Sequence, residues 1–409
     1  MSFANTCAGR PHERAKPDAG ARLPTDPRLT GQAELSLLTP LLTFAGLAAR
    51  DLLGSRPQLA DPEAHLHAAE EWLKRAHDQS VDDGVSYGYS ARGGWRPSYR
   101  ETSGYIATTF FNLARHRNDP DYRERALRIC RWLLSVQNRD GSFSNPRYGD
   151  AGIVFDTGQD LFGLVRAFEE TREIAFRDGA LRAADWLVNI ADGQGHWTRN
   201  EHLGTPHVYN TRTAWAVLRM NQMEYDAERE RVARTNLDWA VSEQQPSGFF
   251  DECAFERGRA PFTHTIAYAT RGLLESGELL IDRRYIDAAQ RCADAALGHV
   301  ADGGFLPGQI AIDGEAAASY CCLTGNCQFS IVWAKLFDRT ANEVYRRAVI
   351  RALDFVMRCQ DIHTVNQDVR GAIKGSHPIW GRYAPLTFPN WPAKFFVDAM
   401  LLRNRWTNG

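Results

Sequence analysis

Apolar residues along the chain fall into two kinds of helical segment. Six segments are apolar on nearly every side, as in residues 106–113 and 329–337, and such helices are buried on most faces. Six others carry apolar residues on one face and charges on the other, which predicts half-exposed helices. They lie near residues 62–77, 121–137, 175–191, 227–244, 282–300 and 342–360. The two kinds alternate strictly, so the pattern predicts six helical pairs.

A polar residue recurs in register where each apolar segment begins. The spacing is about 55 residues, and the repeated positions are Thr102, Thr157, Thr211, Thr265, Thr324 and Asn390. A Thr or Asn side-chain oxygen can accept a hydrogen bond from the unpaired N–H groups of a helix start. We therefore expect these residues to cap the six apolar helices.

Six buried helices inside six half-exposed helices would cover every apolar face. The predicted fold is an all-α (α/α)6 toroid that forms one domain over residues 34–409. Residues 1–33 are polar and rich in Pro, Gly and Arg, without the apolar core of a secretory signal, which predicts a flexible N-terminal arm. Residues 35–49 are the most apolar stretch, but Pro40 interrupts them and they are too short to cross a bilayer. We expect a short helix that covers the domain.

Turns with a glycine and an aromatic residue follow four of the half-exposed helices. They read QNRDGSF from residue 137, DGQGHW from 192, QQPSGFF from 244 and DGGF from 302. Gln137, Gly141 and Phe143 resemble the glutamine-to-aromatic motif of triterpene cyclases. As architecture, the chain is similar to the toroid superfamily of six-hairpin glycosidases, terpenoid cyclases and protein prenyltransferases. The resemblance implies the fold and, through its polysaccharide-active members, a carbohydrate substrate.

The loops of the predicted toroid indicate which rim carries function. Connections from inner to outer helices are short, whereas those from outer to inner helices are long and gather at the N-terminal ends of the inner helices. Long loops in a compact domain are usually functional. Because helix N-termini present unpaired N–H groups, we expect an electropositive mouth that favours an anionic or hydroxyl-rich ligand.

Candidate site residues stand at or just before the inner-helix starts and in the last long loop. The candidates for catalysis are Glu101, Asp156, Asp160, His264 and Tyr383. The candidates for substrate binding are Tyr99, Arg100, Asn210, Arg212, Asn326, His377, Trp380, Arg382, Asn390, Trp391 and Lys394. Aromatic faces beside cationic groups suit a sugar that carries a carboxylate.

Three carbohydrate chemistries fit these residues, and the sequence alone does not separate them. Hydrolysis needs two carboxylates. β-Elimination and epimerisation need a base beside a carboxylate, such as Tyr, His or Lys, with a neutralising cation. Terpenoid cyclisation is disfavoured, because neither a DxDD nor a DDxxD motif occurs and residues 156–160 (DTGQD) are the nearest match.

A cluster of cysteines has two interpretations, a zinc site or buried thiols. Cys321, Cys322 and Cys327 cluster before one apolar helix, with Cys253 and His264 one repeat earlier. Toroids such as the prenyltransferases hold zinc at this rim, but CCLTGNC lacks paired CxxC spacing. We therefore predict no metal and no cofactor.

Composition narrows the class of partner. Lys plus Arg number 48 and Asp plus Glu number 50, for a net charge of −2, which argues against a nucleic-acid ligand. The eight Cys show no regular spacing, which favours a reduced, cytoplasmic setting. The favoured hypothesis is an enzyme that acts on an anionic, uronate-containing glycan. The alternatives are a non-catalytic toroid that binds a glycan or peptide, and a terpenoid-cyclase-like or zinc-dependent enzyme.

Overall fold

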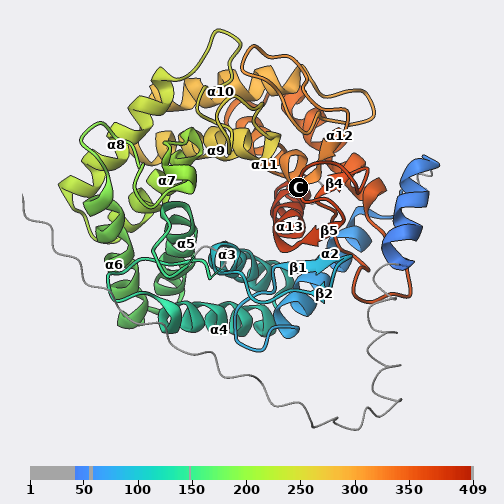
Figure 1. Ribbon diagram of the computed structural model, residues 1–409, viewed down its shortest axis with the longest axis horizontal. Coiled ribbons are helices and arrows are strands. Elements are labelled where there is room, and N and C mark those ends of the chain that lie inside the picture. Colours follow the sequence, from blue (N-terminus) through green and yellow to red (C-terminus); the bar gives the residue numbers. More distant parts are fainter. Residues whose placement is uncertain (1–41, 55–58, 147–148, 407–409) are drawn as a thin grey trace, which may run out of the picture.

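Two concentric rings of helices make up the molecule. The computed structural model describes residues 42–54, 59–146 and 149–406. Figure 1 shows six inner helices surrounded by six outer ones. The inner helices are α3 (Arg100–Arg117), α5 (Val154–Thr171), α7 (Thr211–Asn221), α9 (Thr263–Leu280), α11 (Leu323–Thr340) and α13 (Asn390–Asn404). The outer helices are α2 (Pro62–Asp78), α4 (Pro120–Val136), α6 (Ile174–Ile190), α8 (Ala227–Ser242), α10 (Arg283–Leu297) and α12 (Glu343–Cys359). The predicted all-α (α/α)6 toroid is confirmed.

Short connections join each inner helix to the next outer helix. Four of them are two residues long, and each begins with a residue of positive φ: Asn118, Arg172, Ile281 and Ala341. A left-handed residue ends one helix abruptly, so that the chain reverses at once. In three of the four, the next residue then caps the outer helix through its side chain, as Asp119 does for α4. The long connections therefore all lie at the opposite rim, as predicted.

The prediction that the repeated Thr and Asn residues cap the inner helices is wrong. The inner helices begin at these repeated positions or one to three residues before them, and the residues that precede the helices, such as Tyr99 and Ile153, make no side-chain cap hydrogen bond. Thr hydroxyls inside the first turn bond elsewhere instead. Thr157 Oγ1 accepts from the Phe143 N–H at 2.9 Å, and Thr102 Oγ1 accepts from Asn390 Nδ2 at 2.8 Å. The repeated polar residues therefore hold loops and neighbouring helices rather than helix ends.

The glutamine of each complete turn motif fastens one outer helix to the next. Gln137 Nε2 donates to the Gly141 carbonyl in its own turn and to the Gly179 carbonyl in α6, both at 2.9 Å. Gln244 repeats this pair of bonds with Gly248 and Ala288. Gly141 has φ of +96°, and a Cβ there would lie 2.3 Å from the Arg182 carbonyl oxygen. Only glycine fits this turn, so the resemblance of the motif is structural, as expected.

Short strands close the ring between the first and last long loops. Strand β1 (Gly88–Ser90) pairs antiparallel with β2 (Gly94–Trp95) on one side and with β5 (Thr387–Pro389) on the other. Strands β3 (Cys321–Cys322) and β4 (Ser376–His377) form a second antiparallel pair. Two short 3-10 segments, η1 (His202–Gly204) and η2 (Val208–Asn210), precede α7.

A further helical segment, residues 42–52, lies on the outside of the ring beside the last loop (Figure 1). Phe44 and Leu47 are buried there, while Leu42, Leu52 and Leu53 are exposed. The expected covering helix is confirmed for this part of the chain. The predicted flexible arm, residues 1–33, and its boundary lie outside the described residues. Within the described ranges, no helix combines the length and apolarity that a membrane span requires.

Candidate functional site

Four carboxyl groups gather where α3, α5 and the loop before α7 meet at the N-terminal rim. We call Glu101, Asp156, Asp160 and Glu201 the acid cluster. Burial raises the pKa of Glu101 to about 7, and it raises the pKa of Asp156 well above its usual value, with a further contribution from the Glu101 charge. Neighbouring carboxylates resist ionising together. The cluster therefore keeps protons at neutral pH.

Glu101 is the most exposed member of the acid cluster, and its charge acts on Asp156. Glu101 is the second residue of α3 and is only half-buried, whereas Asp156 in the first turn of α5 is 4% exposed. Hydrogen bonds modulate the pair: the Tyr99 hydroxyl lowers the pKa of Glu101, and Asn145 Nδ2 donates to Asp156 Oδ2 at 3.3 Å. A buried acid next to a group that titrates near 7 can donate a proton to a bound ligand.

Asp160 occupies a different environment. It is completely buried where α5 packs against α3, and a Cβ on Gly104 would lie 2.4 Å from the Asp160 Cα. Burial first, and then the Asp156 and Glu101 charges, raise its pKa well above the usual range. Its position in the helix interface gives a ligand no path to it, so the predicted catalytic role stays a prediction without geometric support.

Glu201 is the member of the acid cluster that the sequence interpretation missed. Its Oε1 accepts from the His202 N–H at 2.8 Å and its Oε2 from Asn210 Nδ2 at 2.6 Å. Burial raises its pKa to about 7. Glu201 lies nine positions before Asn210, outside the repeat register, although it is the only acidic residue in residues 193–210. A search of whole loops, rather than of helix starts, would have found it.

Aromatic side chains surround the rest of this rim. We call the set Tyr87, Tyr99, Phe155, Tyr209, Phe255, Phe262, Tyr383 and Trp391 the aromatic belt. Successive ring contacts of 5.0–5.9 Å run from Tyr99 through Tyr87 to Trp391, and from Tyr383 through Phe262 to Phe155. A hydrogen bond of 2.8 Å from Trp391 Nε1 to the Tyr383 hydroxyl joins the two runs.

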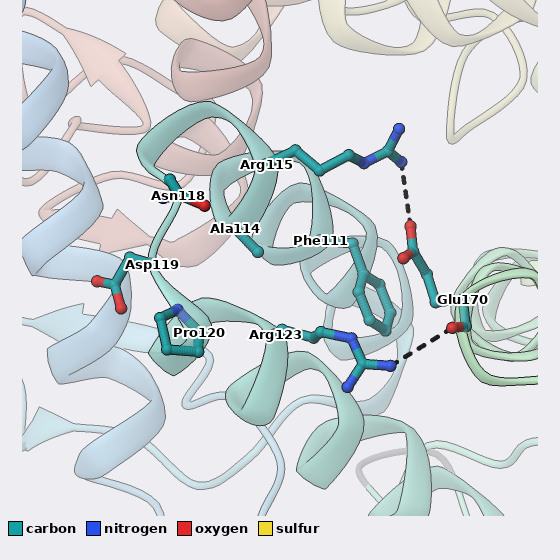
Figure 2. Close-up of a pocket in the computed structure, with 8 residues that line it drawn as sticks. All are labelled: Phe111, Ala114, Arg115, Asn118, Asp119, Pro120, Arg123 and Glu170. Atoms are coloured by element: carbon teal, nitrogen blue, oxygen red, sulfur yellow. Dashed lines mark hydrogen bonds and ion pairs between the residues drawn. The ribbon is translucent and has the colours of Figure 1, made fainter.

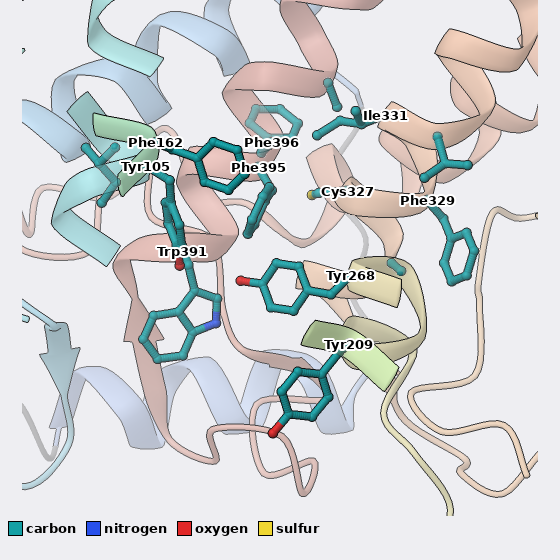
Figure 3. Close-up of a cluster of buried hydrophobic side chains, with 14 of the residues drawn as sticks. Tyr105, Phe162, Tyr209, Tyr268, Cys327, Phe329, Ile331, Trp391, Phe395 and Phe396 are labelled. Carbon is teal, nitrogen blue, oxygen red and sulfur yellow. The ribbon is translucent and has the colours of Figure 1, made fainter. Parts of the chain in front are cut away.

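The acid pair lies beside the aromatic belt, since the Glu101 and Asp156 charges act on both Tyr99 and Tyr209. Among the described residues, no ring contact links Phe155 to Tyr99, and these are the belt members nearest in sequence to Asp156 and Glu101. Tyr87, Tyr99, Phe155, Phe255 and Phe262 are only partly buried. Figure 3 shows Tyr209, Tyr268 and Trp391 gathered in this interior. A ligand here would meet aromatic faces on most sides and carboxyl groups on one.

Arg212 and His264 lie beneath the aromatic belt. The Arg212 guanidinium is surrounded by aromatic rings, the nearest being Tyr268 with its centroid 4.9 Å from Cζ. His264 lies between Tyr268 and Tyr383, and its Nδ1 is 2.6 Å from Gln328 Nε2. Burial and the Arg212 charge lower the pKa of His264 to about 3. His264 is therefore neutral and weakly basic at pH 7.

Several predicted binding residues instead hold loops in place. Arg100 Nη1 donates to the carbonyl and hydroxyl of Ser144. Asn326 Nδ2 donates to the Gly304 carbonyl, and Asn390 Nδ2 to the Ser86 carbonyl. These donor groups are bonded to the protein, which is the ordinary use of buried polar groups, whereas Asn390 Oδ1 has no hydrogen-bond partner among the described residues.

The last long loop does not bring its cations to the acid cluster. His377 lies 3.4 Å from Asp51 Oδ1 in the outer helical segment, and Trp380 and Arg382 are exposed. Only Tyr383 and Trp391 of this group join the aromatic belt. Lys394 lies inside the ring, where its Nζ binds Asp398 Oδ2 at 2.6 Å. The cations of this loop therefore do not reach the acid cluster, and the expected electropositive mouth stays a prediction.

Two hollows on the surface lie away from the acid cluster. One of about 370 Å³ opens at the opposite rim, between the ends of α3 and α5 and the start of α4 (Figure 2). Arg115 and Arg123 both bond to Glu170 across it. The other, of about 600 Å³, lies beside the Gln244 turn. Neither is lined by any member of the acid cluster or aromatic belt.

The three clustered cysteines are buried thiols. Cys321, Cys322 and Cys327 are all 0% exposed, and burial raises the pKa of each thiol. Cys321 Sγ donates to Asn326 Oδ1 at 3.1 Å. In the part of the chain that the structure describes, no three His, Cys, Asp or Glu side chains are placed to hold a metal ion, and the cysteines are free.

Comparisons with known proteins agree on the toroid. No protein-family model matches the chain. An unsaturated glucuronyl hydrolase from Bacillus sp. GL1 superimposes with a TM-score of 0.65 and 15% identity, over 85% of this chain and 98% of that one. An unsaturated glucuronyl hydrolase specific for heparin gives 0.69 and 12%, over 85% and 98%. A D-mannose isomerase gives 0.65 and 12%, over 84% and 97%. At these identities the likeness establishes the fold.

A curated relative is similar to part of the chain. The drimenyl diphosphate synthase of Streptomyces showdoensis is 27% identical over 204 residues, which are 48% of this chain and 37% of that protein. The chain thus matches well under two thirds of the relative's length.

Proposed function

We propose that the chain is a cytoplasmic carbohydrate-active enzyme that hydrolyses a uronate-containing glycan by acid catalysis. The observation that carries the proposal is the Glu101–Asp156 pair, two neighbouring carboxyl groups whose pKa values burial raises. Hydrolysis of a glycosidic bond uses such a pair, with one member protonated and the other ionised. Asp156, the more strongly shifted group, is the proton donor, and Glu101 is the member that ionises first.

Three of the predicted site residues, Tyr99, Tyr383 and His264, are poorly suited to β-elimination and epimerisation. Those reactions need a base to remove a carbon-bound proton. Burial raises the pKa of the Tyr99 and Tyr383 hydroxyls well above the usual value, so both stay protonated. His264 is a weak base, since its pKa is lowered to about 3. The carboxyl pair is thus the better-supported source of catalysis.

Sugar-active toroids support the substrate class. Unsaturated glucuronyl hydrolases share the fold over 98% of their length, and a mutant of one such enzyme forms a complex with dGlcA-GalNAc6S. The aromatic belt offers faces on which sugar rings stack. The free cysteines are consistent with a reducing compartment.

A second candidate function, cyclisation of an isoprenoid, has an observation in its favour. Aromatic rings stabilise cations, and a neutral acid in an aromatic enclosure can protonate an alkene. The partial likeness to a drimenyl diphosphate synthase points the same way. The absent DxDD motif places this candidate second.

The test is an assay of purified protein with uronate oligosaccharides, read by release of reducing ends. We expect turnover that Asp156→Asn and Glu101→Gln each reduce by about 10²-fold or more. Asp302→Asn, on a fully exposed carboxylate, is the matched control and should leave turnover unchanged. A parallel incubation with a linear prenyl diphosphate is read by gas chromatography. Cyclic products there, with no reducing ends from glycans, would refute the hydrolase proposal.

A further inference from the structure

Arg212 differs from the other cations inside the ring because it has no acidic partner. Lys394 binds Asp398 at 2.6 Å, Arg271 binds Glu275 at 3.2 Å, and Lys335 binds Glu275 and Glu278 at 3.0 Å each. Among the described residues, no Asp or Glu lies within ion-pair distance of Arg212, which is 2% exposed. The interior therefore contains one positive charge that the protein does not balance.

Aromatic rings from five inner helices enclose this charge. The ring centroids lie 4.9–5.7 Å from Cζ and belong to Tyr105, Phe162, Trp215, Tyr268 and Phe395. Cation–π contacts offset part of the loss of hydration, but a buried ion normally also pairs with an opposite charge. The enclosure thus holds the guanidinium in place without neutralising it.

The hydrogen bonds of Arg212 leave part of the guanidinium unused. Nε donates to Gln159 Oε1 at 2.5 Å, which fixes the plane of the group. Nη1 is buried and has no hydrogen-bond partner among the described residues. Buried donors in native proteins are almost always satisfied. Arg271 Nη1 is also without a partner, but Arg271 has an ion pair with Glu275, so of these two residues it is Arg212 that lacks both an ion pair and a partner for Nη1. The guanidinium geometry matches a carboxylate.

We propose that Arg212 binds a single carboxylate of the ligand, and so selects a uronate over a neutral sugar. The identification of the carboxylate as a uronate rests on the proposed function. One unbalanced positive charge matches one negative charge. A phosphate dianion would bring a second negative charge close to Glu101, the member of the acid cluster that ionises first and whose carboxyl group feels the Arg212 charge.

The first test is isothermal titration of the full chain with D-glucuronate, D-glucose and inorganic phosphate. We expect glucuronate to bind at least ten-fold more tightly than either of the others. Arg212→Met should weaken glucuronate binding at least ten-fold without changing glucose binding, and Arg212→Lys should weaken it less. Equal affinities for glucuronate and glucose, tighter binding of phosphate, no measurable glucuronate binding, or an unaffected Arg212→Met variant would each overturn the assignment.

A second measurement separates recognition from a structural role. Removing an unbalanced buried charge should not destabilise the fold, so the Tm of Arg212→Met should equal or exceed that of the wild type. Arg271→Met is the matched control, since it leaves Glu275 short of a partner and should lower the Tm. If both variants lose Tm to the same extent, Arg212 is structural and the proposal fails.

The two proposals fail in different ways. Glycan turnover that requires Asp156 but survives in Arg212→Met would leave the hydrolase and remove the carboxylate assignment. If glucuronate binding requires Arg212 but no uronate glycan is turned over, the carboxylate assignment stands and the hydrolase proposal fails.

Discussion

Two groups of buried carboxylates in this molecule have opposite electrostatic environments. Asp51 in the outer helical segment accepts from Lys374 Nζ at 2.7 Å and from the Ile379 N–H at 2.8 Å, and its pKa is lowered to about 2. In that case the partners outweigh burial, which alone would raise the pKa. In the acid cluster, burial and the neighbouring carboxylates outweigh the contacts that lower the pKa, so the pKa values rise.

The comparison distinguishes a site that stabilises the fold from a site whose charges are suited to function. The Asp51 site balances every charge that it buries, which is how a structural ion pair offsets its desolvation. The acid cluster places carboxyl groups beside one another, and Arg212, the cation that acts on Glu101, lies among aromatic rings. Such an arrangement costs stability and persists where the shifted protonation state is useful.

The largest expected effect comes from unbalancing the Asp51 site. Asp51→Asn leaves the Lys374 ammonium, 3% exposed, without its ion-pair partner. We expect the free energy of unfolding to fall by about 3 kcal/mol at pH 7, measured by urea denaturation. The loss should vanish toward pH 2, because the wild-type carboxyl stabilises the fold above its ordinary pKa and that contribution disappears as the pH falls through about 2.

The double variant Asp51→Leu with Lys374→Met is the control for that experiment. It removes both charges, so it should recover most of the lost stability. A single Asp51→Asn variant as stable as the wild type would mean that the two carboxylate groups do not differ in the way described above.

Glu201→Gln should change the free energy of unfolding in the opposite direction and stabilise the fold at high pH. The ordinary pKa of 4.5 is raised to about 7 in the fold. The protonated carboxyl therefore stabilises the fold fully below pH 4.5, and this contribution is lost as the pH rises through 7. We expect the variant to match the wild type near pH 4 and to exceed it by about 1–3 kcal/mol at pH 8, measured by urea denaturation across pH.

Glu256→Gln, on an exposed carboxylate of the same rim, is the control and should show no such pH dependence. The wild type and the variants are compared at the same pH. The contribution of the buried histidines, which all of them contain, therefore cancels from the difference in the free energy of unfolding. A constant difference between Glu201→Gln and the wild type from pH 4 to pH 8 would contradict the raised pKa.

The smallest expected effect is on the Glu101 carboxyl itself. Tyr99→Phe removes a hydroxyl that hydrogen-bonds to Glu101 and lowers its pKa. The pKa of Glu101 should therefore rise further, as measured by NMR titration of the labelled side-chain carboxyl carbon. Tyr345→Phe, which loses a bond to Asp294 in an outer helix, should leave Glu101 unchanged. A fall, or no change, in the Tyr99 variant would show that the hydroxyl does not stabilise the ionised form.

The fold was predictable because it depends on periodicity. A helix buried on all sides and a helix buried on one side have different apolar patterns, and a sixfold repeat makes each pattern visible several times. The helix starts were predicted less well, since the Thr register was interpreted as capping. Thr157 and Thr102 bond to partners 14 and 288 residues away, and such contacts have no local sequence signal.

The site was predicted in part, for a similar reason. Glu101, Asp156 and His264 follow the repeat register and were found. Glu201 lies in a loop outside that register. His377 has the residue type and spacing of a site residue, yet it pairs with Asp51 more than 300 positions earlier. Pairing between distant segments decides whether a charge is neutralised, and a single sequence does not encode that pairing in a readable form.

The pairing of β1 with β5 has a consequence for how the site is assembled. Backbone hydrogen bonds between residues 88–90 and 387–389 join the two ends of the ring without a covalent link. The acid cluster and Arg212 come from residues 101–212, so this half of the site is synthesised before Tyr383 and Trp391 exist. The residues of the acid cluster and Arg212 are therefore complete about half-way through synthesis, whereas the β1–β5 bonds form only after residues 387–389 have been made.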